Sequence, residues 1–447
     1  MSGLDRVGFA AELAAHADAH GPITVGLAGA GQMGTDIVVQ VALMTGIRIG
    51  AIAARRPDRP RAAIAMAGHP DHHGVIASSA SAIDAAIGRG KIAVTDDLAA
   101  LCAAGRIDVV IDATGSPNLG TQLALDAIAN GKHIVMLNVE ADITVGRHLV
   151  AAADRAGVVY TGSAGDEPAT TLELIAFAQS LGMEVVAAGK GKNNPLRIDA
   201  VPADYEAEAQ ARDMNPRMLV EFVDGSKTMV EMTAIANCTG LVPDVPGMHG
   251  PEATLETLAQ VLCTTEDGGI LSAPGRVDFT VGRGVAPGVF CIAKPRHPRA
   301  IERMADLKVG PGPCFSLVRP FHLTSLETPL SAARAVMHGR ADMRPLARPV
   351  AECGARAKRD LAPGETLGRI GESEYRGFAM AWTDARSARA LPLGLAEGSR
   401  VTQPIRCGDL LTHDNCTPDG ELLVTQVRRM LDAADATAYG DDPVPTR

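Results

Sequence analysis

The sequence of 447 residues is poor in aromatic side chains, which make up 3%, with one tryptophan, four tyrosines and eight phenylalanines. Its cores must therefore be built from Ala, Val, Leu, Ile and Met, and a hydrophobic content of 46% is enough for large cores. No window contains about 18 uninterrupted apolar residues, which excludes an ordinary membrane-spanning helix. Charged residues interrupt the first 20 positions, so no signal peptide is predicted. We expect a cytoplasmic protein.

The sequence also lacks an excess of positive charge and closely spaced cysteine pairs. The formal net charge is −10, which argues against sequence-independent affinity for nucleic acid or for an anionic membrane. The eight cysteines are scattered and include no C-x-x-C pair, which indicates free thiols and excludes a disulfide framework. His69, His72 and His73 lack a fourth ligand at zinc spacing, so we interpret them as a solvated loop.

The sequence does contain a phosphate-binding pattern. Residues 23–28 have the apolar character of a buried strand, and they lead directly into a G-x-G-x-x-G turn and a helical pattern. In such a turn Gly29 permits the tight bend, Gly31 lets the backbone approach a pyrophosphate, and Gly34 lets the helix pack on the strand. The helix N-terminus adds unpaired N–H groups and a positive dipole end. A packing turn without a ligand is the alternative. The loop residues predicted to contact a dinucleotide are Gly29, Gly31, Gln32, Met33 and Gly34.

Cofactor choice depends on the end of the second predicted strand, residues 47–54. An acidic residue about 20 positions after the glycine turn would accept a hydrogen bond from the ribose of NAD. This sequence has Arg55 and Arg56 there instead. Two guanidinium groups suit a 2′-phosphate, so we predict NADPH as the cofactor, with NAD held by other groups as the alternative.

Polar residues follow two later predicted strands. Thr114 and Gly115 come at the end of a strand over residues 108–114, and Asn138 ends a strand over residues 133–138. Ligands of open α/β sheets bind at these carboxyl ends. We therefore predict that Thr114, Gly115 and Asn138 contact the nicotinamide side of the cofactor. Glu140 is either a substrate or carboxamide contact or a charge stabilised by a helix N-terminus.

The alternation of strand and helix patterns predicts an α/β fold. Residues 1–165 form the expected Rossmann domain, a doubly wound parallel sheet that binds a dinucleotide. Residues 166–345 contain a predicted helix at 170–181 and a predicted strand at 184–190, and we expect a central α+β domain for catalysis and dimerisation. Short strands separated by Gly and Pro turns predict a small β-rich domain over residues 346–447.

These motifs support a family resemblance that covers nearly the whole chain. Residues 23–45 and 108–140 resemble the Rossmann domain of homoserine dehydrogenases. Later runs resemble the deoxyxylulose-5-phosphate reductoisomerase-like enzymes, which have a homoserine-dehydrogenase-like build and a C-terminal SAF-type domain. The reductoisomerase-like runs are 190–195, 224–231, 246–251 and 319–329. The SAF-like runs are 357–367, 395–398 and 404–409.

The resemblance implies an NADPH-dependent reductoisomerase that converts 1-deoxy-D-xylulose 5-phosphate to 2-C-methyl-D-erythritol 4-phosphate by an alkyl shift and hydride transfer, in isoprenoid-precursor synthesis. It also implies a homodimer and a small polar substrate with a phosphate or carboxylate. Three alternatives stay open. They are reduction of a small aldehyde, as in homoserine dehydrogenases, NAD-dependent oxidoisomerisation of a branched sugar acid such as apionate, and a non-catalytic nucleotide sensor.

The rearrangement requires a proton carrier, a positive group near the enolate oxygen and an anion clamp. Lys190 and Lys192 alternate at a strand end and so share one face, with Asn193 next to them. We predict these three residues as catalytic, with the two ammonium groups lowering each other's pKa. A solvated strand end is the alternative.

The remaining predicted substrate-binding residues are Lys227, Arg319, His322, Glu140 and His249. The first three form the expected anion clamp, and His249 lies on a glycine-flanked loop that could close over substrate. A core histidine and a surface lysine are the alternatives for His322 and Lys227. Asp166 and Glu167 resemble the acidic turn that holds a divalent metal in the authentic reductoisomerases, but here the two acids are adjacent and precede Pro168, as in a helix cap. We therefore predict no metal site, and the lysine pair would replace a metal ion as the electrophile. Glu231 is interpreted as a charge on a helix face.

Overall fold

The computed structural model describes residues 5–193, 196–212 and 214–440. The chain divides into two compact units. Unit 1 consists of Met1–Ala141, Gly146–Asp166 and Leu323–Arg344, and unit 2 consists of Asp142–Val145, Glu167–His322 and Pro345–Arg447. The three-domain division drawn from the sequence stays a prediction.

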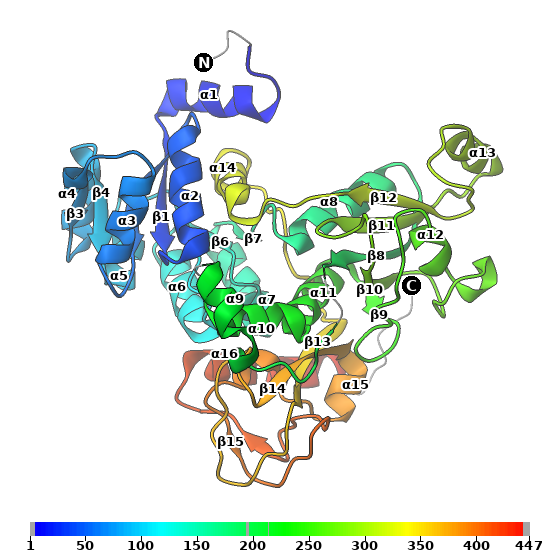
Figure 1. Ribbon diagram of the computed structural model, residues 1–447. Coiled ribbons are helices and arrows are strands. Elements are labelled where there is room, and N and C mark those ends of the chain that lie inside the picture. The colour runs from blue at the N-terminus through cyan, green and yellow to red at the C-terminus, as the bar shows by residue number, and fades with distance from the viewer. Residues whose placement is uncertain (1–4, 194–195, 213, 441–447) are drawn as a thin grey trace. The chain divides into compact units, whose positions relative to one another are not determined.

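Unit 1 is built on a parallel sheet (Figure 1). Among its described residues the sheet has seven strands in the order β3-β4-β2-β1-β5-β6-β7, and each neighbouring pair is parallel. The order reverses at β1, so the carboxyl ends of β1 and β5 form the switch point where such sheets bind ligands. The strands are β1 (Ile23–Ala28), β2 (Ile47–Ala53), β3 (Gly74–Ile76), β4 (Ile92–Thr95), β5 (Val109–Asp112), β6 (His133–Met136) and β7 (Tyr160–Gly162).

One helix of unit 1 comes from far along the chain. Helix α14, drawn in yellow in Figure 1, packs on β5 and β6. Its Ala332 and Ala333 belong to the same apolar core as Val25 and Leu27 of β1. Ser331 of this helix accepts a hydrogen bond from the Ala164 N–H at 2.7 Å. The helices of this unit are α1 (Phe9–His20), α2 (Gln32–Leu43), α3 (Asp58–Met66), α4 (Ala80–Gly88), α5 (Leu98–Ala103), α6 (Pro117–Ala129), α7 (Val139–Ala156) and α14 (Thr328–His338).

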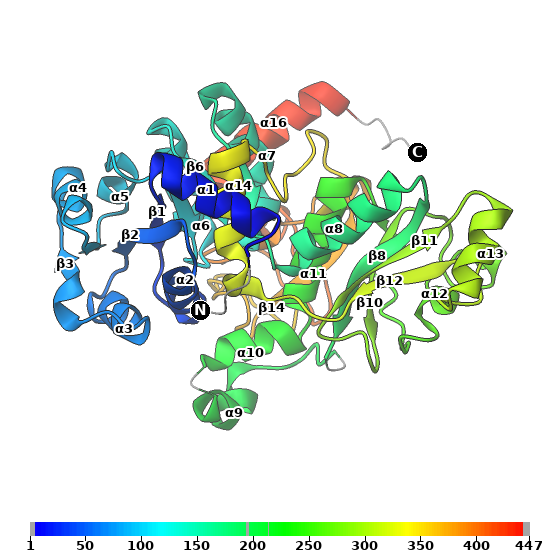
Figure 2. The same cartoon turned by 90° about the horizontal axis from the view of Figure 1, so that it is seen from above.

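Unit 2 contains a mixed sheet with β8 at its centre. In the part of the unit that the structure describes, five strands follow the order β12-β11-β8-β10-β9, with β10 parallel and β11 antiparallel to β8. Helices α8 and α11 pack against β8, as Figure 2 shows. The strands are β8 (Glu184–Lys192), β9 (Val242–Pro243), β10 (Arg276–Val281), β11 (Val289–Lys294) and β12 (Phe315–Arg319).

The C-terminal region of unit 2 begins with a two-stranded antiparallel pair, β13 (Ala351–Ala357) and β14 (Tyr375–Ala381), that packs on α11. A second small pair is formed by β15 (Arg400–Val401) and β16 (Cys416–Thr417). The helices of unit 2 are α8 (Glu167–Ser180), α9 (Glu206–Ala211), α10 (Pro216–Val223), α11 (Ser226–Thr239), α12 (Leu258–Val261), α13 (Pro298–Asp306), α15 (Trp382–Ser387) and α16 (Leu423–Tyr439).

The α/β fold class is confirmed, including the parallel Rossmann-like sheet and a further small β region. Strand β8 extends two residues beyond the predicted 184–190 and thereby includes Lys192. The predicted β-rich C-terminal region also contains α16, a 17-residue helix that the Gly and Pro turns did not indicate. No helix in the described part of the chain combines the length and apolar character needed to cross a membrane.

Asn237 anchors the C-terminal pair of strands to α11. Its Oδ1 accepts hydrogen bonds from the Val350 N–H at 2.9 Å and the Ala351 N–H at 3.1 Å, and its Nδ2 donates to the Ala351 carbonyl at 3.1 Å. We expect Asn237→Ala to leave buried backbone groups unpaired and to lower the free energy of unfolding by about 2–3 kcal/mol. Urea denaturation measures this effect. Asn130→Ala at an exposed helix end is the control, and equal losses in the two variants would contradict the anchoring role.

Candidate active site

In the glycine turn after β1, two of the three glycines lie too close to neighbouring backbone to carry a side chain, and the third borders open space. Gly29 has φ +105°, and a Cβ there would lie 2.4 Å from the Ala113 carbonyl oxygen. A Cβ at Gly34 would lie 2.2 Å from the Gly29 carbonyl oxygen. A Cβ at Gly31 would meet nothing within 4 Å. Gly29 and Gly34 therefore permit close packing, whereas Gly31 borders open space at the start of α2.

That open space suits a pyrophosphate. Gly31 is the N-cap of α2 and supplies no side-chain acceptor for the first-turn N–H groups of the helix. These groups, which include those of Gln32 and Met33, and the positive end of the helix dipole form an anion-binding arrangement. The residues present thus fit a dinucleotide, with its phosphates beside Gly31.

A buried carboxylate organises the neighbouring loop. Asp112, fully buried at the end of β5, accepts hydrogen bonds from the Thr114 N–H at 2.8 Å, the Thr114 hydroxyl at 2.7 Å and Asn138 Nδ2 at 3.0 Å. Burial raises the pKa of Asp112 above its ordinary value, and the charge of Glu140 adds to this effect. Gly115 has φ +64° and a Cβ there would meet nothing within 4 Å, so this turn also borders open space.

The side chain of Asn138 forms hydrogen bonds with the neighbouring backbone. Its Nδ2 also donates to the Ser116 carbonyl at 2.9 Å, and its Oδ1 caps α7 by accepting from the Ala141 N–H at 3.2 Å. The side chain is buried. We therefore expect Asn138 to hold the loop that carries Thr114 and Gly115. Glu140 is partly exposed in the first turn of α7, where the helix dipole favours a negative charge.

Arg55 and Arg56 follow β2 directly and are exposed. Arg56 Nε lies 3.9 Å from an Asp58 carboxylate oxygen, an exposed pair that contributes little to stability. Both guanidinium groups are at the carboxyl end of the sheet, where the 2′ position of an adenosine ribose is bound in related folds.

The second group of predicted residues meets on β8 in unit 2. Lys190 Nζ donates to Glu167 Oε1 of α8 and to Glu231 Oε2 of α11, both at 2.5 Å. Lys190 and Lys192 are both buried, with 8% and 4% of their surface exposed. The two glycines beside them allow this crowding, because a Cβ at Gly189 would lie 1.7 Å from the Asp278 carbonyl oxygen and one at Gly191 would lie 2.4 Å from the Ala286 nitrogen.

The surroundings shift the pKa values of Lys190 and Lys192 in opposite directions. Burial alone would lower the pKa of Lys190, but Glu167 and Glu231 raise it above its ordinary value. Burial and the charge of Lys190 lower the pKa of Lys192 to about 8. The expectation that each ammonium lowers the pKa of the other is therefore wrong for Lys190, because two carboxylates stabilise its charge. The site thus holds one ammonium whose charge is stabilised by two carboxylates and one lysine whose pKa is lowered to about 8.

Two more predicted residues belong to the same cluster. His322 Nε2 lies 3.3 Å from Glu167 Oε1, the oxygen that accepts from Lys190. Lys227 is partly exposed one turn before Glu231 on α11, and its charge opposes the rise that burial and Glu167 cause in the pKa of Glu231.

The other predicted residues are engaged elsewhere. Arg319 Nη1 forms an ion pair with Glu173 at 3.1 Å and lies over the Phe321 ring. His249 Nε2 is 2.8 Å from Asp244 Oδ2 on an exposed loop. Asn193 is exposed just after β8, and Asn194 and Pro195 of the same run lie outside the described residues. The roles assigned to these residues stay predictions.

Two carboxylates have roles that the sequence interpretation missed. Glu167 was expected to cap a helix and Glu231 to be a surface charge, but both bind Lys190. Glu231 is fully buried and lies between Val230 and Met232 in an otherwise apolar stretch. A buried carboxylate requires a cationic partner, so its apolar surroundings were the signal that could have identified it.

Glu167 and Glu231 are also potential metal ligands. Together with the buried Asp166, which precedes Glu167, they offer three carboxylate oxygens within 4.8 Å of one another, close enough to ligate one divalent cation. The ammonium of Lys190 already bridges Glu167 and Glu231, with one of its three donors remaining for another acceptor. The arrangement therefore provides a positive charge without a metal ion.

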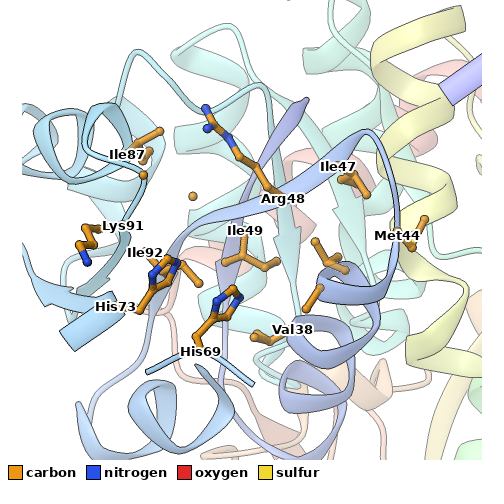
Figure 3. Close-up of a pocket in the computed structure, with 14 residues that line it drawn as sticks. Val38, Met44, Ile47, Arg48, Ile49, His69, His73, Ile87, Lys91 and Ile92 are labelled. Carbon is orange, nitrogen blue, oxygen red and sulfur yellow. The ribbon is translucent and has the colours of Figure 1, made fainter. Parts of the chain in front are cut away.

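A separate cavity of about 240 Å³ lies at the opposite, amino-terminal end of β2 and β4 (Figure 3). Its walls include Ile47 and Ile92, and the rings of His69 and His73 stack there with centroids 4.3 Å apart. Burial and the neighbouring His69 lower the pKa of His73. Because the cavity begins where these strands begin, it is distinct from the predicted dinucleotide loop.

Comparison with known proteins gives two family matches. The model described as homoserine dehydrogenase, NAD binding domain, matches residues 29–161. The model described as oxidoreductase DRL, catalytic domain, matches residues 165–328. The chain is an NAD(P)-dependent oxidoreductase. The first match contains the glycine turn and the Asp112 network, and the second contains the lysine–glutamate cluster. A search of curated proteins gives no match.

Solved structures show weaker similarity. A "probable dehydrogenase" from Thermotoga maritima is 14% identical over 71% of this chain and 90% of its own, with a TM-score of 0.40. A DOX-P reductoisomerase in complex with magnesium is 12% identical over 73% and 71%, with a TM-score of 0.37. An oxidoreductase from Agrobacterium radiobacter in complex with NAD+, L-tartaric acid and magnesium is 16% identical over 39% of this chain and 45% of its own, with a TM-score of 0.29. The matched region thus spans less than half of the last protein, and at these scores the similarities do not assign a reaction.

The contrast between Gly31 and Gly34 provides a test of the cofactor loop. We expect Gly31→Val to fold with an unchanged melting temperature but to weaken NADPH binding by about tenfold or more, because the new side chain fills the space beside the helix N-terminus. Gly34→Val should instead lower the melting temperature, since its Cβ meets the Gly29 carbonyl. Fluorescence titration and thermal unfolding measure the two effects. Full NADPH affinity in Gly31→Val would contradict this placement.

Proposed function

We propose that the protein is an NADPH-dependent reductoisomerase that converts 1-deoxy-D-xylulose 5-phosphate to 2-C-methyl-D-erythritol 4-phosphate, in a cytosolic isoprenoid-precursor route. The observation that carries the proposal is the buried Lys190–Lys192 pair with its two different pKa values, inside the segment that matches the DRL catalytic model. Arg55 and Arg56 in place of an acidic residue support NADPH over NAD. A homodimer and an SAF-type C-terminal domain belong to the same proposal.

The lysines provide the two functions that the alkyl shift requires. Neutral Lys192 removes the proton from the substrate hydroxyl, and the adjacent carbon–carbon bond breaks to give an aldehyde and an enolate. Lys190, held as an ammonium by Glu167 and Glu231, donates its remaining N–H to the enolate oxygen. A proton then passes from the hydroxyl of the enediolate to the former ketone oxygen, so that the carbon that bore the ketone becomes the nucleophile. This carbon attacks the aldehyde carbon, its neighbour becomes the new aldehyde, and the protonated Lys192 returns its proton to the alkoxide formed in the attack.

Reduction of the new aldehyde completes the reaction. NADPH, when bound, supplies the hydride. Lys192, neutral after returning its first proton, takes a second proton from solvent and gives it to the alkoxide that forms, so one hydride and one proton are added to each carbonyl reduced. In this scheme His322 and Lys227 sit beside Glu167 and Glu231, where they adjust the charge around Lys190.

Two other reactions fit the same groups. Reduction of a small aldehyde needs only the cofactor and a proton donor, as in homoserine dehydrogenases. Oxidoisomerisation of a branched sugar acid such as apionate uses the same proton carrier with NAD in the oxidising direction. The rearrangement is favoured because aldehyde reduction alone gives no role to a permanent ammonium beside a titrating lysine.

A substrate panel separates these reactions. NADPH absorbance is followed with 1-deoxy-D-xylulose 5-phosphate and with aspartate semialdehyde, and NAD reduction with a set of sugar acids that includes apionate. We expect turnover of the pentulose phosphate, and we expect it to persist with a chelator because Lys190 provides the positive charge. Turnover of aspartate semialdehyde alone would refute the rearrangement, and complete loss with the chelator would refute the metal-free electrophile.

The pH dependence tests the role of Lys192. Lys192 must be neutral to take a proton, so kcat/KM should fall as the pH decreases through about 8. Lys192→Met should reduce kcat/KM by about 10²-fold or more and remove this limb of the profile, with NADPH affinity retained. The exposed Lys308→Met is the control. A profile that keeps the same limb in Lys192→Met would assign the titration to another group.

A further inference from the structure

The C-terminal strand pair of unit 2 places two arginines directly opposite each other. Arg356 on β13 pairs with Arg376 on β14 in the antiparallel register, so the two side chains share one face. Like charges in this position destabilise a strand pair. Such an arrangement is expected where an anion is bound, because the ligand then offsets the repulsion.

Neither guanidinium forms a salt bridge within the described residues. Both lie against the Phe378 ring, with Arg356 Cζ 3.8 Å and Arg376 Cζ 5.7 Å from its centroid. Arg376 Nη1 donates to the Gly377 carbonyl at 3.3 Å, and the buried Nε of Arg356 has no hydrogen-bond acceptor. The pair is therefore fixed in place by an aromatic ring while retaining donors for a further acceptor.

The pair lies next to the start of α11. The Gly377 N–H, adjacent to Arg376, donates to the Ser226 hydroxyl at 2.9 Å, and the Ser226 N–H donates to Asp224 Oδ1 at 2.8 Å. The charge of Asp224 also opposes the fall that burial causes in the pKa of Lys192 and of Arg376. The strand that carries Arg376 is thus hydrogen-bonded to the first residue of α11, the helix that also carries Glu231.

The local charges do not balance. Lys358 Nζ lies 3.1 Å from Asp224 Oδ2, and both side chains are almost completely buried. Asp224 thus interacts with the cationic groups of Lys358 and Arg376, and Arg356 adds a further cation opposite Arg376. The neighbouring Glu374 lies 3.6 Å from Arg359, which also pairs with Glu365 at 2.8 Å. Cationic groups therefore outnumber carboxylates around the arginine pair, which favours the binding of an anion.

We propose that Arg356 and Arg376 bind the anionic end of the substrate, and that this end is a dianion of the phosphate monoester class. The inference rests on the proposed function for the chemistry at the other end of the substrate. It also changes the predicted clamp, since Arg319 and His322 already contact Glu173 and Glu167, whereas no salt bridge of Arg356 or Arg376 is found in the part of the chain that the structure describes. The C-terminal region thereby determines which substrates reach Lys192.

Direct binding of inorganic phosphate to the full-length protein tests the site without turnover. Calorimetry compares the unchanged protein with Arg376→Met, with the charge-conserving Arg356→Lys, and with the exposed Arg369→Met as the matched control. We expect Arg376→Met to weaken phosphate binding by about tenfold or more and Arg369→Met to leave it unchanged. Arg356→Lys should weaken it by a smaller factor, because a lysine keeps the charge but loses the bidentate geometry.

Kinetics add a readout that a structural role would not produce. With 1-deoxy-D-xylulose 5-phosphate, Arg376→Met should raise KM by about tenfold while kcat and NADPH affinity stay within about threefold. The two proposals can fail separately. If Arg376→Met loses phosphate binding but the unchanged protein does not turn over the pentulose phosphate, the anion site stands and the proposed function is refuted. Unchanged phosphate affinity in both Arg376→Met and Arg356→Lys would overturn the site. Binding of malonate in preference to phosphate would overturn the phosphate class.

Discussion

The buried ion cluster of Lys190 with Glu167 and Glu231 is the interaction on which unit 2 depends. Each partner belongs to a different element, so the cluster joins the central strand β8 to the two helices that cover it. Taking these charges out of water is expensive, and the cost is recovered only when the geometry and hydrogen bonding are nearly complete. Removing one member would leave the others buried without compensation. Such a group is expected where a charge has to be held in a fixed place.

The charge of Lys190 also sets the properties of its neighbour. Lys192 lies two residues further on the same strand, and its pKa falls because it is buried and lies close to the charge of Lys190. A flexible surface pair would not produce this separation, because water would screen both groups. The alternation of lysine and glycine is what brings the helices and the neighbouring strands close enough to exclude that water. The chemistry of the site therefore follows from backbone packing as much as from the identity of the charged residues.

The parts of the fold that depend on local patterns could be predicted from the sequence. The apolar strand at 23–28, the glycine turn and the following helix identify the Rossmann-like sheet, because each feature occurs within a few residues of the next. The return of α14 to unit 1 could not be predicted, since its Ala332 and Ala333 look like any small apolar helix face until the sheet they cover is known.

In the candidate site, too, local features could be predicted from the sequence and contacts between distant elements could not. The Lys-Gly-Lys alternation identified both lysines, but not the opposite shifts in their pKa, which depend on carboxylates 23 positions before and 41 positions after Lys190. Arg356 and Arg376 are 20 positions apart with a loop between them, and only the strand register shows that they are opposite each other. Spacing along one strand is visible in a sequence, whereas pairing between distant elements is not.

The central claim is that one lysine of the pair stays charged while the other titrates near pH 8. Carbon–nitrogen correlated NMR of lysine side chains in isotopically labelled protein reports each ammonium group directly, with assignments from Lys190→Arg and Lys192→Arg. The account predicts that the Lys192 signal titrates near pH 8 and that the Lys190 signal does not titrate across the range in which the protein is folded. Two lysines that titrate together at the ordinary pKa of an exposed side chain would contradict it.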